Sequence, residues 1–339
     1  MADPAVSILL PFRDAAATLP ACLASIRQQT LPNYELLFID DGSVDRGPQL
    51  ITAVAGNDAR IRLSSAPRPG LVAALNHGLR LAAADLVARM DADDLMHPRR
   101  LELQCSAMAR RPDLTVIASR VRAFPEDRLT AGLRAYLDWQ NGCVSPEAIA
   151  ADLYLESPVV HPSVILRRQP VLRAGGYCEG DFPEDYELWL RLRRSGHGIG
   201  KVPQHLLWWR DHDGRVSRTD PRCAREAFDR LRARYLAVDQ RVLEASDRLV
   251  VWGAGRKTRK RVERLLTAGF EPRAWVDIDP RKIGNRLNGV PVVAPAWLRG
   301  RRPKPLVLSY VASHGARSCI EAELARLGYR KGVDYLHVG

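Results

Sequence analysis

The sequence predicts an α/β protein with a mostly parallel sheet, followed by a second, smaller α/β domain. Apolar runs recur about every 25 residues in the first hundred and alternate with helical patterns, as βαβ units require. The same alternation restarts after Arg248. The charge changes there as well: residues 1–240 carry 31 basic and 30 acidic side chains, whereas residues 241–339 carry 20 and 9. The excess behind the net charge of +12 therefore lies almost wholly in the second domain.

The elements of the first domain follow from the spacing of its apolar residues. Strands are predicted where short apolar runs end in turn residues, namely at 6–10, 36–39, 61–63, 86–90, 159–166 and 205–209. Helices are predicted where apolar residues recur at helical spacing, namely at 15–29, 71–84, 184–194 and 221–238. We expect the last of these helices to close a first domain of residues 1–244.

The pattern of apolar residues in the remaining segment, 245–339, predicts a compact βαβ domain. Its strands are expected at 249–252, 274–276, 290–293 and 306–310, and its helices at 256–268 and 316–327.

Several global features exclude whole classes of protein. The apolar run Val6–Phe12 is too short for a secretory signal and has no basic segment before it. No stretch approaches the roughly 18 apolar residues of a membrane-spanning helix. The six cysteines include no C-x-x-C pair, which favours free thiols over a zinc site or a disulfide framework. We therefore expect a cytoplasmic protein without a membrane span.

Acidic clusters follow two of the predicted strands, at Asp40-Asp41-Gly42-Ser43 and Asp91-Ala92-Asp93-Asp94. Ligands bind beyond the carboxyl ends of parallel strands. Three carboxylates within four residues repel one another unless a cation or hydrogen-bond donors neutralise them, which favours a divalent metal such as Mg²⁺ or Mn²⁺. A helix N-terminus is the alternative for the second cluster. For the first, a contact to a nucleotide base competes with an Asx turn.

Both clusters belong to a longer series of motifs. In chain order these are Ser7–Asp14, Leu37–Ser43, Leu75–Gly78, Arg89–Asp94, His161–Ser163, Pro183–Trp189 and Trp209–His212, followed by Ser217. The series covers about residues 5–220 and resembles the family 2 glycosyltransferases of GT-A fold. The resemblance implies a GT-A type domain and inverting transfer of a sugar from a nucleotide-diphosphate sugar, such as a UDP-sugar, to an acceptor hydroxyl. The setting it implies is the synthesis of bacterial surface polysaccharide or glycolipid.

The resemblance also implies the residues that hold the donor. Pro11, Arg13 and Asp41 would hold the base, and Arg13 stands where many members have a tyrosine. A guanidinium can also stack on a base. Asp91 would lie near the ribose, and Arg89 would support the nucleotide.

Metal and catalytic roles follow in the same way. Asp93 would bind the divalent metal, Mg²⁺ or Mn²⁺, and His212 would contact the metal or the diphosphate; an ordinary loop histidine is the alternative. Asp185 would be the general base, because inversion needs a carboxylate on the acceptor side. Its neighbour Glu184 would raise its pKa through like-charge repulsion; acids that open a helix are the alternative. His161 would shape the acceptor wall.

Further features bear on the mode of transfer. The Gln-x-x-Arg-Trp motif of processive synthases is missing, which favours addition of a single sugar. Trp208-Trp209 could stack a sugar, but we expect them to pack in the core.

The second domain has an incomplete dinucleotide motif. Gly253-Ala254-Gly255 follows a strand and Asp277 ends the next one, but the third glycine is missing. The stretch 277–292 is similar to the small Rossmann-like domain of sugar acetyltransferases, which contacts a nucleotide sugar. A docking or dimerisation domain without ligand is the alternative.

Two other classes of function remain as alternatives. The basic second domain could bind nucleic acid or an anionic surface, although it lacks interleaved aromatic residues, so no nucleic acid is expected. The second alternative is an NAD-dependent oxidoreductase. The expected partners are a nucleotide-diphosphate sugar and a glycan or lipid-linked acceptor. Peripheral association with the cytoplasmic face of the membrane and a homodimer stay open.

Overall fold

The computed structural model describes residues 3–311 and 315–339. The chain folds as two compact units, the first made of Met1–Pro146 with Pro158–Thr219 and the second of Glu147–Ser157 with Asp220–Gly339. This division differs from the boundary expected at Glu244. The reason is that helix α10 (Arg225–Leu236) packs on α12 (Arg256–Thr267) of the second unit. An ion pair of 3.0 Å between Asp229 and Arg261 joins the two helices.

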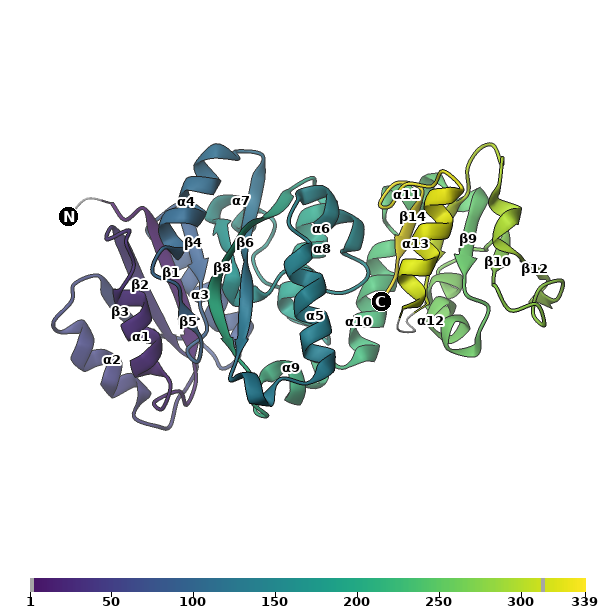
Figure 1. The fold of residues 1–339 in the computed structure, drawn as a ribbon. Coiled ribbons are helices and arrows are strands. Elements are labelled where there is room, and N and C mark those ends of the chain that lie inside the picture. Colours follow the sequence, from purple (N-terminus) through teal and green to yellow (C-terminus); the bar gives the residue numbers. More distant parts are fainter. Residues whose placement is uncertain (1–2, 312–314) are drawn as a thin grey trace. The chain divides into compact units, whose positions relative to one another are not determined.

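In the first unit, the described strands form an eight-stranded sheet in the order β3-β2-β1-β4-β7-β6-β8-β5 (Figure 1). Their bounds are β1 (Val6–Phe12), β2 (Tyr34–Asp40), β3 (Ile61–Ser65), β4 (Leu86–Arg89), β5 (Leu95–Met96), β6 (Leu114–Phe124), β7 (Ile165–Arg167) and β8 (Gly198–Arg210). The first four strands pair in parallel, as does β8 with β6, whereas β7 runs antiparallel to β4 and β6 and β5 runs antiparallel to β8. This arrangement confirms the α/β class with a mostly parallel sheet.

Helices cover this sheet. Those of the first unit are α1 (Leu19–Arg27), α2 (Gly47–Ala55), α3 (Leu71–Leu81), α4 (Arg100–Arg110), α5 (Ala131–Gly142), α7 (Arg168–Arg173), α8 (Glu184–Arg194) and α9 (Val216–Thr219). They form because apolar residues recur on one face; α1, for example, buries Leu19, Leu23 and Ile26. On α3, Gly78 permits close approach to β1, since a Cβ there would overlap Leu9 Cδ1.

In the middle third of the chain, the spacing of apolar residues did not predict every element. The strand expected at 159–166 is a 3₁₀ turn, η2 (His161–Ser163), followed by the short β7. Pro162, which has no N–H to donate to a strand ladder, lies inside that turn. The long strand β6 was not predicted, and β8 extends well beyond the expected 205–209. Helix α8 has the predicted bounds.

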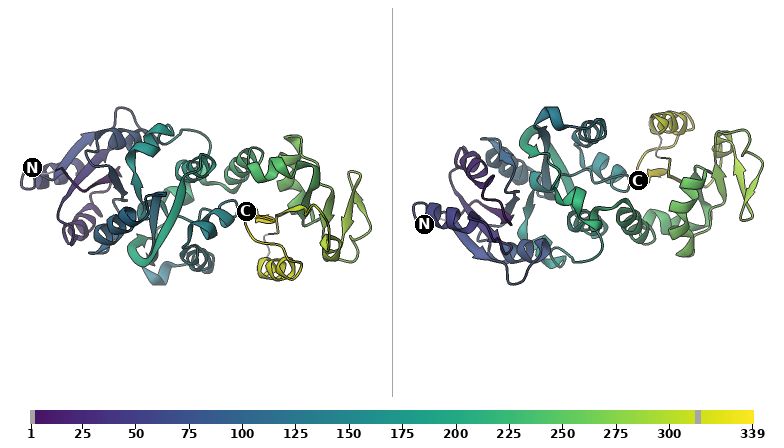
Figure 2. Two further views of the ribbon diagram at one scale, coloured as in Figure 1. Left: turned by 90° about the horizontal axis from the view of Figure 1, so that it is seen from above. Right: turned by 90° about the horizontal axis from the view of Figure 1, so that it is seen from below.

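The second unit has a six-stranded sheet among its described residues, in the order β11-β12-β10-β9-β13-β14. The strands are β9 (Leu249–Trp252), β10 (Ala274–Val276), β11 (Arg286–Leu287), β12 (Val290–Val293), β13 (Leu306–Ser309) and β14 (Tyr335–His337). The remaining helices are α6 (Pro146–Asp152), α10, α11 (Gln240–Glu244), α12 and α13 (Ala316–Arg326). Figure 2 shows the yellow α13 on one face of this sheet and the green α12 on the other. All pairs except β11 with β12 are parallel, as expected for a Rossmann-like layer.

Two global predictions can be compared with the structure. Over residues 3–311 and 315–339, no helix is long and apolar enough to cross a bilayer. All six cysteines lie among the described residues and carry a thiol rather than a disulfide.

Candidate active site

The carboxyl ends of β1, β2 and β4 lie side by side and carry the predicted donor residues. After β2, the Asp41 N–H donates to the carbonyl of Phe12 at 2.9 Å, which joins the ends of the first two strands. Asp41 Oδ1 accepts a hydrogen bond of 2.6 Å from the N–H of Gly70, the residue before α3. Gly70 has φ of +119°, which a glycine adopts without strain. The start of α3 therefore orients the Asp41 carboxylate.

The loop after β1 is tied to the loop after β2. Asp14 Oδ1 accepts the Val44 N–H at 2.8 Å, and the Asp14 N–H donates to Ser43 Oγ at 3.0 Å. Arg13 beside it has a side chain that is 60% exposed and able to reach outward. Pro11, in contrast, is buried within β1.

The Asx-turn alternative holds for the first acid of the Asp40-Asp41 pair. Asp40 Oδ1 accepts the Ser43 N–H at 3.0 Å, which closes the turn. The two neighbouring acids thus have different tasks: Asp40 shapes the loop, whereas Asp41 faces Gly70.

The acidic turn after β4 gathers carboxylate oxygens of Asp91, Asp93 and Asp94 within 4.8 Å of one another. Arg89 forms an ion pair with Asp91, and its guanidinium is only 4% exposed. Burial raises the pKa of Asp91, while the Arg89 charge opposes that rise. Arg89 therefore orients Asp91 from beneath the surface.

Asp94 is the buried member of this turn. Its Oδ1 accepts the Arg210 backbone N–H at 2.7 Å, which fastens the turn to the end of β8. Its Oδ2 has no hydrogen-bond partner among the residues that the structure describes. Burial, followed by the charges of Asp91 and Asp93, raises the pKa of Asp94 well above its ordinary value.

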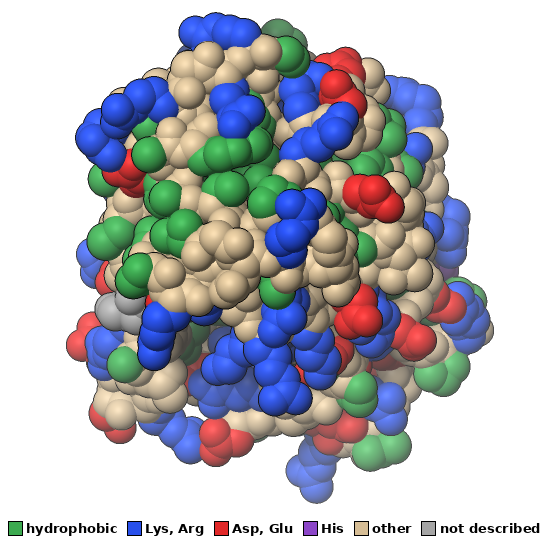
Figure 3. Space-filling view, turned by 90° about the vertical axis from the view of Figure 1, so that its right-hand side faces the viewer, with side chains coloured by type: hydrophobic (Ala, Val, Ile, Leu, Met, Phe, Trp, Pro, Cys, Tyr) green, Lys and Arg blue, Asp and Glu red, His purple; other side chains and the backbone are tan. Residues whose placement is uncertain are grey.

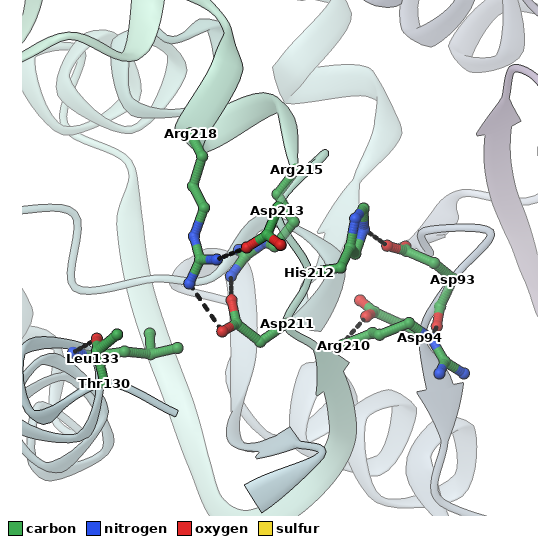
Figure 4. A network of polar contacts seen from close by, with 10 residues as sticks. All are labelled: Asp93, Asp94, Thr130, Leu133, Arg210, Asp211, His212, Asp213, Arg215 and Arg218. Carbon is green, nitrogen blue, oxygen red and sulfur yellow. Dashed lines mark hydrogen bonds and ion pairs between the residues drawn. The ribbon is translucent and has the colours of Figure 1, made fainter. Parts of the chain in front are cut away.

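His212 is brought to the acidic turn from 119 residues away. Its Nε2 lies 2.9 Å from Asp93 Oδ2, and both side chains are partly exposed (Figure 4). Arg210 Nε donates to the carbonyl of Asp93 at 2.7 Å, so with the Arg210 N–H bond to Asp94 the segment is attached at three points. His212 thus contacts the acidic turn, and its binding of a metal or diphosphate stays a prediction.

The loop that carries His212 is anchored by a buried acid. Asp211 is 2% exposed and forms ion pairs with Arg218 at 2.8 Å and Arg215 at 3.3 Å. Arg218 also contacts Asp213, as Figure 4 shows. Arg215 lies over the ring of Trp209, 3.7 Å from its centroid. These contacts hold both flanks of the histidine.

The donor set fits a hard divalent cation. The carboxylate oxygens of Asp93, close to those of Asp91, and the imidazole of His212 beside them suit Mg²⁺ or Mn²⁺. Oδ2 of the buried Asp94, which has no hydrogen-bond partner among the described residues, is a further carboxyl oxygen in the same turn. When bound, such a cation offsets negative charge on phosphate oxygens.

Glu184 and Asp185, the acids expected on the acceptor side, are the first two residues of α8. Burial and then the neighbouring Glu184 charge raise the pKa of Asp185 to about 7. Asp185 Oδ1 accepts the N–H of Tyr186 at 2.7 Å. The group is therefore poised to exchange a proton near neutral pH.

A buried histidine supports this pair. His161 Nδ1 lies 3.8 Å from Glu184 Oε1, and its Nε2 lies 2.8 Å from the hydroxyl of Tyr177. Burial and the Arg89 charge lower the pKa of His161 well below its ordinary value. The neutral ring therefore packs between Tyr177 and Glu184, and its expected place in the acceptor wall stays a prediction.

Trp208 and Trp209 are half-buried and pack against neighbouring rings. Trp208 stacks on His97 with ring centroids 5.6 Å apart, and Trp209 lies against Tyr136 at 6.5 Å.

Sequence reasoning missed the residue that positions Tyr177. Asn76 Oδ1 accepts the Tyr177 N–H at 2.9 Å, and Asn76 Nδ2 donates to the Tyr177 carbonyl at 2.8 Å. Gly176 lies so close that a Cβ there would overlap Asn76 Oδ1. The only signal available was the Leu75–Gly78 motif, which does not name its partner 101 residues away.

The second unit has a different polar edge. Asp277 Oδ2 accepts the Ala254 N–H at 2.9 Å and pairs with Lys282 Nζ at 3.1 Å, while Oδ1 accepts the Asp279 N–H at 2.9 Å. Both carboxylate oxygens are therefore already engaged by the chain. This disfavours the dinucleotide interpretation, which needs that carboxylate for a ribose hydroxyl.

Comparison with other chains supports the identity of the first unit. The family model "Glycosyl transferase family 2" matches residues 7–175. The amylovoran biosynthesis glycosyltransferase AmsE of Erwinia amylovora is 31% identical over 203 residues, which cover 60% of this chain and 74% of AmsE. The UDP-Gal:alpha-D-GlcNAc-diphosphoundecaprenol beta-1,3-galactosyltransferase of Escherichia coli is 28% identical, covering 60% of this chain and 73% of that protein.

Solved structures agree on the fold. S. aureus TarS 1-349 in complex with UDP-GlcNAc superposes with a TM-score of 0.52 at 14% identity, covering 78% of this chain and 79% of TarS. The mannosyltransferase PcManGT of Pyrobaculum calidifontis, in complex with GDP-Man and Mn²⁺, superposes with a TM-score of 0.51 at 20% identity, covering 79% of this chain and 69% of PcManGT. The first unit therefore has the GT-A-like fold of glycosyltransferases. On these matches and on the ordered motifs that carry the site, the chain belongs to the family 2 glycosyltransferases.

Proposed function

We propose that this glycosyltransferase moves a single sugar, with inversion, from a UDP-sugar to a hydroxyl of a glycan or lipid-linked acceptor in bacterial surface polysaccharide synthesis. The pairing of Asp93 with His212 beside Asp91 carries the proposal, because it brings a divalent-metal donor set to the end of β4. The relatives named for amylovoran synthesis and for galactosyl transfer to a diphosphoundecaprenol support the choice of donor and acceptor. Such chemistry would take place in the cytoplasm.

The donor-side residues would act together. Asp41 would accept a hydrogen bond from the base, and the exposed Arg13 would stack on it. Asp91, oriented by Arg89, would bind the ribose. Asp93 and His212 would hold Mg²⁺ or Mn²⁺, which supplies charge stabilisation for the diphosphate. Pro11 would contribute by fixing the strand end rather than by direct contact, since it is buried.

Asp185 would remove the proton of the acceptor hydroxyl while the sugar is displaced. Its pKa of about 7 suits a base that is partly deprotonated at neutral pH. Glu184 would sustain that pKa by repulsion, and His161 would fix the position of Glu184.

We also propose that the second unit is an independent Rossmann-like domain. Its own core, formed by residues such as Val250, Val276 and Val307, supports this assignment. Whether it contacts a nucleotide sugar, as the similarity to sugar acetyltransferases implies, stays a prediction.

Calorimetric titration of UDP tests the donor site. We expect UDP to bind in the presence of Mn²⁺ and to bind weakly without it. Asp93→Ala should abolish the dependence on Mn²⁺, whereas Asp113→Ala, which removes an exposed acid paired with Arg111, should leave it unchanged. UDP binding that is indifferent to Mn²⁺ in the unaltered protein would overturn the proposal.

Asp185→Asn tests the base. The substitution keeps the shape of the side chain and should abolish transfer while leaving the affinity for UDP and Mn²⁺ unchanged. Screening nucleotide sugars for slow donor hydrolysis by the unaltered protein would identify the sugar. Full transfer by Asp185→Asn would exclude Asp185 from the chemistry.

A further inference from the structure

Helix α12 of the second unit presents an unusually basic exposed face. Its buried face consists of Thr258, Val262 and Leu265. The exposed cations, which we call the basic stripe, are Arg256, Lys257, Arg259, Lys260 and Arg264. Within the described part of the chain, no carboxylate oxygen lies within 4.0 Å of any of their charged nitrogens. Figure 3, which faces the second unit, shows Lys and Arg side chains gathered densely near the bottom of that view.

The charges of the basic stripe destabilise the helix that carries them. Arg256, Lys260 and Arg264 stand at i, i+4 and i+8, so like charges are neighbours along one line of the helix surface. Arg256 and Lys257 also lie in the first turn, which contains no acidic residue and where the helix dipole disfavours cations. Packing of the buried face holds the helix despite this repulsion. An anionic surface in contact with the basic stripe would reduce the repulsion between these cations.

An exposed apolar residue adjoins the start of α12. The hydrogen bond from Ala254 N–H to Asp277 Oδ2 joins the loop before the helix to the loop after β10. Ile278 in that second loop is 75% exposed. Cations together with a protruding apolar side chain are typical of surfaces that settle on a bilayer, where phosphates meet acyl chains.

We propose that the basic stripe, with Ile278 beside it, binds the anionic surface of a lipid bilayer. The inference rests on the proposed lipid-linked acceptor, which would lie in a membrane. Helix α12 contains no aromatic residue on which bases could stack, which disfavours single-stranded nucleic acid.

Sedimentation with vesicles tests the proposal on the full chain. The protein should bind vesicles containing phosphatidylglycerol, fail to bind pure phosphatidylcholine vesicles, and dissociate as salt rises. A basic side chain near an anionic membrane contributes about fivefold to binding, so Arg256→Gln, Lys260→Gln and Arg264→Gln together should weaken it about 100-fold. Ile278→Ser should weaken it further.

Three exposed arginines of the first unit provide a control of equal charge. Arg27→Gln, Arg80→Gln and Arg173→Gln together remove the same net charge and should leave vesicle binding unchanged. Circular dichroism should show both triple variants folded. Equal loss in the two variants would show a nonspecific effect of net charge and overturn the assignment.

Two further outcomes separate this inference from the proposed function. If UDP binds with Mn²⁺ but the protein ignores phosphatidylglycerol vesicles, the surface proposal fails and the transferase proposal stands. If vesicles bind but UDP does not, the reverse holds. Tighter binding to duplex DNA than to vesicles at the same salt, lost in the stripe variant, would assign the stripe to nucleic acid and overturn the lipid proposal.

Discussion

Replacing Asn76 with alanine should loosen the loop that holds Tyr177 near the Glu184–Asp185 pair. The amide of Asn76 satisfies both the N–H and the carbonyl of Tyr177, a residue that is 3% exposed. Tyr177 in turn contacts His161, which lies against Glu184. The perturbation therefore starts far from the carboxylates in sequence and reaches them through two side chains.

The magnitude follows from the two lost hydrogen bonds. Each contributes about 0.5–1.5 kcal/mol net, and leaving a buried donor or acceptor without a partner costs about 1–3 kcal/mol. Water that enters the loop would form hydrogen bonds with some of these unpartnered groups. We therefore expect a loss of about 3 kcal/mol in the free energy of local opening. That corresponds to about 150-fold faster opening-limited exchange.

Hydrogen exchange measured by mass spectrometry checks this directly. Peptides covering 174–180 should exchange about 150-fold faster in Asn76→Ala, because the Tyr177 N–H loses its acceptor. Asn57→Ala, which removes an exposed amide bonded only to the Ala53 carbonyl, should not change exchange in this loop. Unchanged exchange in Asn76→Ala would refute the claim that Asn76 holds the loop.

Two other predictions follow from the site and the core. Because Asp185 must be deprotonated to act as a base, transfer should rise with pH through about 7, and Glu184→Gln should move that limb to lower pH by removing the repulsion that raises the pKa of Asp185. A limb that stays in place in the pH–rate profile of Glu184→Gln would contradict this. Gly78→Ala should destabilise the first unit by about 2 kcal/mol in urea unfolding, because its Cβ would overlap Leu9, although alanine ordinarily favours a helix. Gly132→Ala, with open space around it, should be neutral or slightly stabilising; similar losses in both variants would exclude the overlap as the cause.

Local patterns were enough to predict the parallel half of the first sheet and the acids at its edge. The segments that form β1, β2 and β4 are short, apolar and followed by turn residues. Neighbouring residues are therefore enough to indicate that each segment is a strand and where the strand ends. Asp41, Asp91 and Asp93 follow those ends directly, and parallel strands bring them to one edge. Helix α8 was equally clear, because Pro183, two acids and regular apolar spacing mark its start.

The spacing of apolar residues did not predict elements that are stabilised by partners distant in the sequence. Strand β6 owes its length to pairing with β8 through an irregular register, which apolar spacing within β6 does not encode. The boundary between the units was displaced for a similar reason: α10 was assigned to the first domain by its position in the chain, whereas Asp229 attaches it to α12.

The sequence by itself determined the fold class, the acids at the strand ends and, through ordered motifs, the family. Only the tertiary structure decided which of those residues meet. It paired Asp93 with His212, set Asn76 against Tyr177, and buried Arg89 under Asp91. The physical reason is that secondary structure is favoured by residues a few positions apart, whereas these contacts span up to 119 residues and form only when whole elements pack.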